Sequence, residues 1–114
     1  MIDVDEDTFG KLVELALDGI PAGLRREMSN IAIAVEDLGA SPNLLGLYHG
    51  IPLTQRTTQY AGVMPDRITI YRLPILRRCQ TLDDVVRQVR ITVVHEVAHH
   101  FGIGDARLHE LGWA

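Results

Sequence analysis

Apolar residues recur every three or four positions in two stretches of the chain, and this spacing predicts two amphipathic helices. The first helix should cover residues 8–20, with Gly19 and Pro21 closing it. The second should begin after Thr81, which is a good N-cap, and should run without a break to Phe101. Valines give this second helix apolar surface over much of its circumference, as expected of a helix that packs inside the protein.

Three further segments have the pattern of β-strands. Large and small apolar side chains alternate in residues 30–36, which fits a strand buried on both faces and makes this segment the best candidate for the central strand. Residues 45–53 predict a second strand, and Pro52 excludes it from the centre of a sheet. Residues 67–73 alternate strictly between apolar and polar side chains, which predicts a half-exposed strand.

Two shorter segments complete the predicted layout. Residues 55–62 are polar and partly β-branched, which indicates a short strand or loop near the edge of the sheet. Residues 106–111 predict a last short helix, with Trp113 packed nearby. The whole pattern predicts an α/β or α+β fold, in which a small, twisted, mixed sheet of three to four strands packs against the N-terminal helix and the long second helix.

The composition is typical of one globular domain over residues 1–114. Hydrophobic residues make up 46% of the chain and charged residues 23%, so its 114 residues can bury one modest core. The net charge of −4 argues against general nucleic-acid binding, which needs a clustered positive surface. Arginines between positions 67 and 90 are expected to form a solvated face paired with carboxylates.

Cysteine usage and the start of the chain bear on location. Cys79 is the single cysteine, which excludes an intramolecular disulfide and suits a reducing compartment. The acidic N-terminal residues lack the basic start and the apolar core of a signal peptide. No apolar run approaches the length that spans a bilayer. We therefore expect a cytoplasmic protein without membrane attachment.

Two histidines and a glutamate in the second helix point to a metal site. His95 and His99 are four residues apart, so a helix places both imidazoles on one face, one turn apart, where they can bind one ion. Glu96 projects beside the pair, where it can hold and deprotonate a metal-bound water without being a ligand itself. The two imidazoles would form half of a tetrahedral zinc site.

A glycine turn after this helix would bring a third ligand to the ion. Gly102 can adopt the left-handed conformation that commonly ends helices, and this turn would carry Asp105 back toward the histidines. Two histidines and one carboxylate leave a fourth position for water, which is typical of a catalytic zinc site. Asp105 also precedes a predicted helix, so it has the alternative role of an N-cap. We favour the ligand, alone or together with the cap.

The spacing H-E-x-x-H-x-x-G-x-x-D in this stretch resembles the zinc signature of metzincin-like peptidases, with Asp in place of the third His. Residues 95–112 look like the small bacterial zincin-like metallopeptidase family, whose members are compact mini-zincins. The resemblance implies a mini-zincin fold with Zn²⁺ held by His95, His99 and Asp105. It also implies peptide hydrolysis with Glu96 as general base. Metzincins carry a methionine turn after the third ligand, whereas no Met follows Asp105 here.

Several residues near the motif have roles that the sequence leaves open. His109 could approach the ion or the substrate, or it could lie on the surface of a short helix. Glu110 could replace Asp105 as the carboxylate ligand. The side chains that could stabilise an oxyanion are those of Tyr48, Tyr60, Tyr71 and His109.

The expected partner is a peptide or protein substrate in extended conformation. In zincin-like enzymes an exposed strand edge near the metal binds the substrate backbone as an added strand, and one of the two segments around Gly62 would serve. Two rival functions stay open. One is a partner-interaction domain whose zinc is structural or whose catalysis is vestigial, and the other is a metal-dependent nuclease. Glu96 favours the peptidase over the nuclease.

Overall fold

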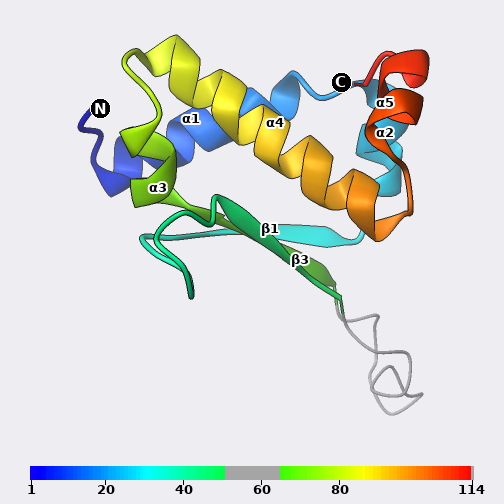
Figure 1. Cartoon of the computed structure of the whole chain (residues 1–114), viewed down its shortest axis with the longest axis horizontal. Coiled ribbons are helices and arrows are strands. Elements are labelled where there is room, and N and C mark those ends of the chain that lie inside the picture. Colours follow the sequence, from blue (N-terminus) through cyan, green and yellow to red (C-terminus); the bar gives the residue numbers. More distant parts are fainter. Residues whose placement is uncertain (51–64, 114) are drawn as a thin grey trace.

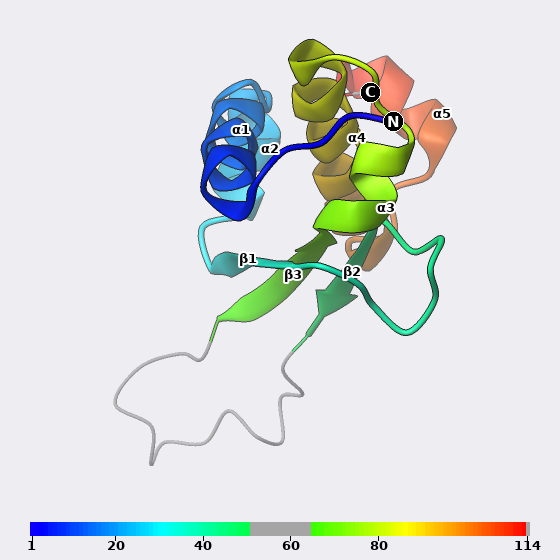
Figure 2. The same ribbon diagram turned by 90° about the vertical axis from the view of Figure 1, so that its left-hand side faces the viewer.

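The protein is described here by a computed structural model, which describes residues 1–50 and 65–113. Helices gather on one side of a small sheet, and α1 and α4 lie side by side across it (Figures 1 and 2). This arrangement confirms the predicted α+β fold. The elements are α1 (Glu6–Asp18), α2 (Ala22–Glu27), β1 (Ile31–Glu36), β2 (Gly46–His49), β3 (Asp66–Tyr71), α3 (Arg72–Arg77), α4 (Leu82–His100) and α5 (Asp105–Leu111).

The sheet is mixed and has the strand order β1-β3-β2. β1 runs parallel to β3, and β2 runs antiparallel to it with Gly46 opposite Ile70. The prediction that residues 30–36 form the central strand is therefore wrong, because β1 lies at one edge and β3 is central. β2 lies at the other edge of the sheet, as its proline predicted.

The helices cover only one face of the sheet, and this explains why the predicted central position of β1 was wrong. Ile31 and Ile33 pack against the core, whereas the small side chain of Ala32 points to the uncovered face and is exposed. Alternation of large and small residues therefore marks the two faces of an edge strand here. A strand buried on both faces would show a similar pattern, and only the packing of the helices distinguishes the two cases.

β3 is more buried than the half-exposed strand that its alternation predicted. All four residues from Ile68 to Tyr71 are buried, since β3 has a strand on each side and α4 above it. The strand ends at Tyr71 rather than at residue 73, and the chain enters α3 directly. There the guanidinium of Arg72 donates hydrogen bonds to Asp37 Oδ1 at 2.9 Å and to the Val4 carbonyl at 2.7 Å.

Each of the two long helices begins at a residue whose side chain caps it. In α1 the Asp5 carboxylate accepts a hydrogen bond from the Thr8 backbone N–H at 2.7 Å. In α4 the hydroxyl of Thr81 accepts from the Asp84 N–H at 3.0 Å, and the Asp84 carboxylate accepts from the Thr81 N–H at 3.1 Å. This capping box confirms the predicted start of the long helix.

The core lies between the helices and the covered face of the sheet. Its largest fully buried side chains come from α1, α2, β3, α3, α4 and α5, and include Phe9, Leu24, Ile68, Ile70, Ile75, Val85, Val89, Val93, Val97 and Leu108. Cys79 is buried among them, and burial raises the pKa of its thiol. Within residues 1–50 and 65–113, no helix has the length and apolar character needed to cross a membrane.

Candidate metal centre

The helix that carries the histidines is fixed by its buried face. Val93, Val94, Val97 and Ala98 of α4 are buried in the core, so the opposite face of the helix points outward. His95 and His99 are exposed on that outer face, with ring centroids 5.7 Å apart and an edge-to-face orientation. The helical spacing therefore brings the two imidazoles together as the sequence predicted.

The chain reverses after α4 through a glycine turn. Gly102 has φ +72°, and its N–H donates to the His99 carbonyl at 3.1 Å. The next N–H, of Ile103, donates to the Ala98 carbonyl at 2.7 Å. These two hydrogen bonds form a Schellman motif, which satisfies the last carbonyls of the helix and turns the chain back on itself. The predicted role of Gly102 is confirmed.

α5 begins at Asp105, shortly after the glycine turn. Its N-cap is Gly104, and Asp105 is the first helical residue, so Asp105 does not act as the N-cap. Leu108 holds the short helix in place, because its side chain is 1% exposed and packs in the core. The capping role considered for Asp105 is therefore wrong.

Ligand atoms of His95, His99 and Asp105 all lie within 4.8 Å of one another. Four ligands arranged tetrahedrally around Zn²⁺ lie about 3.3 Å apart, given metal–ligand distances of about 2.0–2.2 Å. All three side chains are exposed, so small rotations can close the difference. Two imidazoles and a carboxylate are a donor set that zinc accepts, and the residues therefore fit this ion.

Glu96 lies next to these groups in a less exposed setting. Burial raises the pKa of its carboxyl group, while His99 and His95 act in the opposite direction to a smaller extent. With both histidines it lines a groove of about 280 Å³ between α4 and residues 43–46. A carboxylate with a raised pKa accepts a proton more readily than an ordinary one, which suits a general base.

On one side of this groove, β2 comes unusually close to α4. A Cβ at Gly46 would lie 2.7 Å from the Thr92 methyl group, so only glycine permits this approach without a shift. No role for Gly46 was predicted from the sequence. Glycine inside a strand signals a close backbone approach, and that signal was present.

Aromatic contacts tie the end of α4 to the sheet. The ring of His100 stacks on that of Tyr48 in β2, with centroids 4.0 Å apart. The Tyr48 hydroxyl donates to the Asp66 carboxylate at 2.7 Å, and His100 Nε2 lies 3.8 Å from the same oxygen. His100 is thus a packing residue on the sheet side of α4. These contacts hold the histidine-bearing turn of α4 over β2 and β3.

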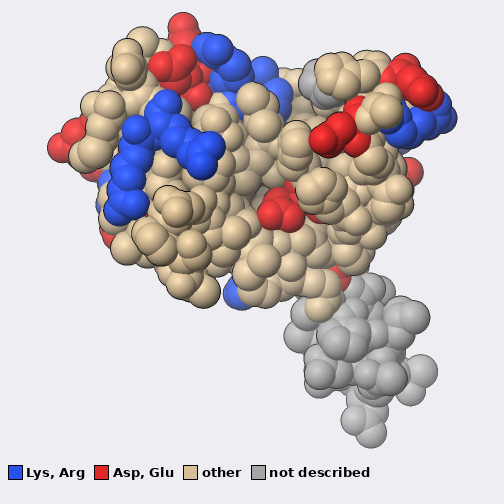
Figure 3. All heavy atoms as spheres, viewed as in Figure 1, with Lys and Arg blue, Asp and Glu red and all other residues tan. Residues whose placement is uncertain are grey.

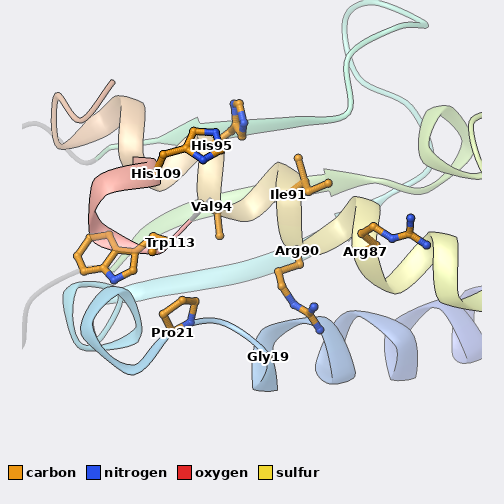
Figure 4. Close-up of a pocket in the computed structure, with 10 residues that line it drawn as sticks. Gly19, Pro21, Arg87, Arg90, Ile91, Val94, His95, His109 and Trp113 are labelled. Carbon is orange, nitrogen blue, oxygen red and sulfur yellow. The ribbon is translucent and has the colours of Figure 1, made fainter. Parts of the chain in front are cut away.

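The other candidate residues are placed differently. Glu110 pairs with Arg107 at 3.0 Å and does not join the three-residue cluster. Tyr71 is buried, with its ring against Gly39. Tyr60 lies outside the described residues. His109, four residues after Asp105, lines a second hollow together with His95 (Figure 4).

The predicted substrate edge has to be reassigned. Of the two segments around Gly62, residues 67–73 contain β3, which is central and offers no free edge. Residues 55–62 lie outside the described part of the chain. Among the described strands, β2 is the edge strand in contact with α4. Its residue Gly46 lines the same groove as Glu96.

Charge is unevenly distributed around this region. On the face seen in Figure 3, most Lys and Arg side chains gather toward α3 and the N-terminal half of α4, a smaller basic group lies at the α5 end, and the middle of the face is uncharged except for acidic side chains. Part of this basic surface is paired, since Arg87 contacts Asp84 at 3.2 Å.

Comparison with known proteins finds a matching family and a solved structure with a similar fold. A family model described as zincin-like metallopeptidase matches residues 27–113. A solved structure of a conserved hypothetical protein from Thermus thermophilus is similar in fold, with a TM-score of 0.54 and 21% identity. That match covers 86% of this chain and 94% of the other. A search of the curated proteins found no match.

Proposed function

Because the chain belongs to the zincin-like metallopeptidase family, we propose that it is a zinc-dependent peptidase with its active site on the exposed face of α4. One observation carries the proposal. Ligand atoms of His95, His99 and Asp105 converge within 4.8 Å, and the partly buried Glu96 lines one groove together with the two histidines. Three protein ligands with an adjacent base are typical of a catalytic zinc site rather than a structural one.

In hydrolysis, the metal ligands and Glu96 have separate roles. His95, His99 and Asp105 would hold Zn²⁺, which would acidify a water molecule and polarise the scissile carbonyl. Glu96 accepts a proton from the attacking water, whose oxygen forms the new bond to the carbonyl carbon. As the carbon–nitrogen bond breaks, Glu96 returns that proton to the leaving amine. One carboxylate thus serves as base and then as acid.

Among the described strands, the position of β2 at the edge of the sheet supports an extended substrate. β2 is the outer strand beside α4, and a peptide backbone added there would pass along the groove that Glu96 lines. Main-chain hydrogen bonds would then supply much of the affinity. Methylation of a peptide nitrogen near the scissile bond should weaken binding. Equal binding of methylated and unmethylated peptides would contradict this mode of recognition.

The metal itself is tested by stoichiometry and stability. The purified protein should bind about one zinc ion per chain, and a chelator should lower its melting temperature. At a free zinc concentration of about 100 times Kd, binding to the folded state alone stabilises it by about 2.7 kcal/mol. Protein purified without metal that shows no thermal shift on adding zinc would rule the site out. Zinc binding without cleavage of any peptide would favour the partner-interaction domain instead.

A further inference from the structure

The helix that carries the third candidate ligand is short and lies at the periphery of the protein. Figure 1 shows α5 beyond the C-terminal end of α4, at the opposite end of that helix from α3. α5 has seven residues, and all of them except Leu108 and Leu111 are exposed. A helix of this length is only marginally stable in isolation, so contacts with the rest of the protein must hold it.

Polar contacts within α5 do not attach it to the other elements. In the described part of the chain, the backbone hydrogen bonds of residues 105–113 are formed with one another or with Gly104. The ion pair between Arg107 and Glu110 also joins two residues of α5 itself. The attachment therefore depends on apolar side chains.

Two apolar side chains attach this segment. Leu108 is 1% exposed and belongs to the hydrophobic core. After α5 the chain reverses at Gly112, which has φ +73°, and the Trp113 N–H donates to the Leu108 carbonyl at 2.9 Å. The reversal places the indole of Trp113 against Gly23 of α2, where it packs on the core (Figure 4).

The same segment carries Asp105 to the histidines. Asp105 lies three residues before Leu108, so docking of Leu108 in the core fixes the position of the carboxylate. That carboxylate then lies within 4.8 Å of the ligand atoms of His95 and His99. An ion bound by all three side chains would join α5 to α4 directly, across the turn at Gly102. Without the ion, the apolar contacts alone oppose the conformational entropy that the segment gains on release.

We propose that Leu108 and Trp113 position the third zinc ligand, and that docking of residues 105–113 and zinc binding form one coupled step. The proposal rests on the zinc site of the function proposed above. In the metal-free protein the segment opens and closes, and zinc binds tightly to the closed state because that state offers three ligands. The measured zinc affinity is then reduced by the fraction of molecules in which the segment is open.

Hydrogen exchange of the parent protein tests the coupling without any substitution. In metal-free protein the amides of α5 should exchange at least about 10-fold faster than those of residues 12–16 in the middle of α1, because local opening exposes them. Saturating zinc should slow α5 by about 10-fold or more, at labelling times when α1 has not exchanged in either state. The proposal is overturned if α5 exchanges as slowly as α1 without zinc, or equally fast with and without zinc.

Two carboxylate variants show whether the ion acts through Asp105. Zinc bound by the histidines alone cannot hold the segment, so Asp105→Asn at saturating zinc should exchange in α5 at the metal-free rate. Glu110→Gln removes a charge from the same helix outside the ligand cluster, and it should keep the protection by zinc. Zinc-dependent protection of α5 that survives in Asp105→Asn would contradict the coupling.

A pair of glycine variants tests the reverse direction, from docking to zinc affinity. A Cβ at Gly23 would lie 2.9 Å from an atom of the Trp113 ring, so Gly23→Ala displaces the indole. Its zinc affinity should fall by about 3-fold or more although neither residue is a ligand, since the coupling between two sites is reciprocal. Gly10→Ala adds the same methyl group to α1, where nothing lies within 4 Å, and should bind zinc like the parent.

A pair of leucine variants measures the larger effect. Leu108→Ala removes the buried anchor and should weaken zinc binding about 10-fold or more. Leu76→Ala makes the same truncation in the core at α3, and the folded variant should bind zinc within about 2-fold of the parent because the two sites are distant. If Leu108→Ala does not fold, Gly23→Ala and the exchange of the parent decide the question.

The outcomes separate this inference from the peptidase function. Zinc affinity that is equal in the parent, Gly23→Ala and folded Leu108→Ala would overturn the positioning role and leave the peptidase function standing. None of these measurements needs turnover. Absence of peptide cleavage by a protein whose α5 responds to zinc would therefore contradict the peptidase function and leave the coupling intact.

Discussion

Replacing Asp105 by asparagine separates metal binding from folding, because the structure gives the carboxylate little part in the fold. Asp105 is exposed, and the N-cap of its helix is Gly104. The substitution therefore loses no cap and removes only a favourable charge from the first turn, at about 0.3–1 kcal/mol. Leu108 still anchors α5 in the core. The free energy of unfolding of metal-free Asp105→Asn should lie within about 1 kcal/mol of the parent's.

Zinc affinity should respond much more strongly. A neutral amide brings no negative charge to a divalent ion and is a poor zinc ligand. Loss of a residue that merely orients a ligand costs about 10–100-fold in metal affinity, so loss of a ligand should exceed about 100-fold, or about 2.7 kcal/mol. Competition with a chromophoric chelator measures this change directly. Denaturant unfolding of the metal-free proteins measures the effect on the fold.

A neighbouring carboxylate supplies the control. Glu110 lies on the same helix, pairs with Arg107 and stays outside the three-residue cluster. Glu110→Gln removes the same charge and should change zinc affinity less than about 3-fold, since exposed charges are screened by solvent and salt. If Asp105→Asn binds zinc like the parent, Asp105 is not a ligand, and His109 should be tested in its place. An equal loss in both variants would indicate a general charge effect.

Two further predictions concern the fold that positions the site. Gly46→Ala should destabilise the protein by about 1–3 kcal/mol, because the new methyl group would collide with the methyl of Thr92. Gly10→Ala should instead stabilise α1 by about 0.5–1 kcal/mol, because nothing lies within 4 Å of the new atom. Chemical denaturation measures both effects. The backbone N–H of Gln80, followed by that of Thr81, holds the pKa of Asp84 below its ordinary value. The ionised Asp84 carboxylate therefore stabilises the fold above its unfolded-state pKa, and this contribution is lost as pH falls through the folded-state pKa. Asp84→Asn should be less stable than the parent near pH 7 and closer to it at about pH 3. A difference in the free energy of unfolding that stays the same at both pH values would contradict this linkage.

The local features of the site followed from the sequence because each depends on neighbours along the chain. The spacing of His95 and His99 on a helix, the cap at Thr81 and the left-handed turn at Gly102 are all set within a few residues. Helix geometry and glycine conformation then suffice to place the groups. Convergence of Asp105 on the histidines was predictable for the same reason.

Features that depend on contacts between distant segments were not predictable in this way. β1 and β3 both carry strongly apolar residues, so periodicity alone could not identify the central strand. The order depends on the pairing of both β1 and β2 with β3. The second hollow needs the α1–α2 connection, α4 and Trp113 to meet, and these segments are far apart in the sequence. Only the folded chain shows that Arg90 and His95 line one cavity.

Peptide cleavage by the zinc-loaded protein, measured for the parent and for Glu96→Gln against one diverse peptide library, tests the central claim most directly. Glu96 is outside the ligand cluster, so the variant should keep zinc affinity within a few fold of the parent. Cleavage should fall by about 100-fold or more, because the proton transfer that Glu96 performs is lost. Unchanged turnover in the variant, or loss of zinc together with activity, would contradict the assignment of Glu96 as the general base of a zinc peptidase.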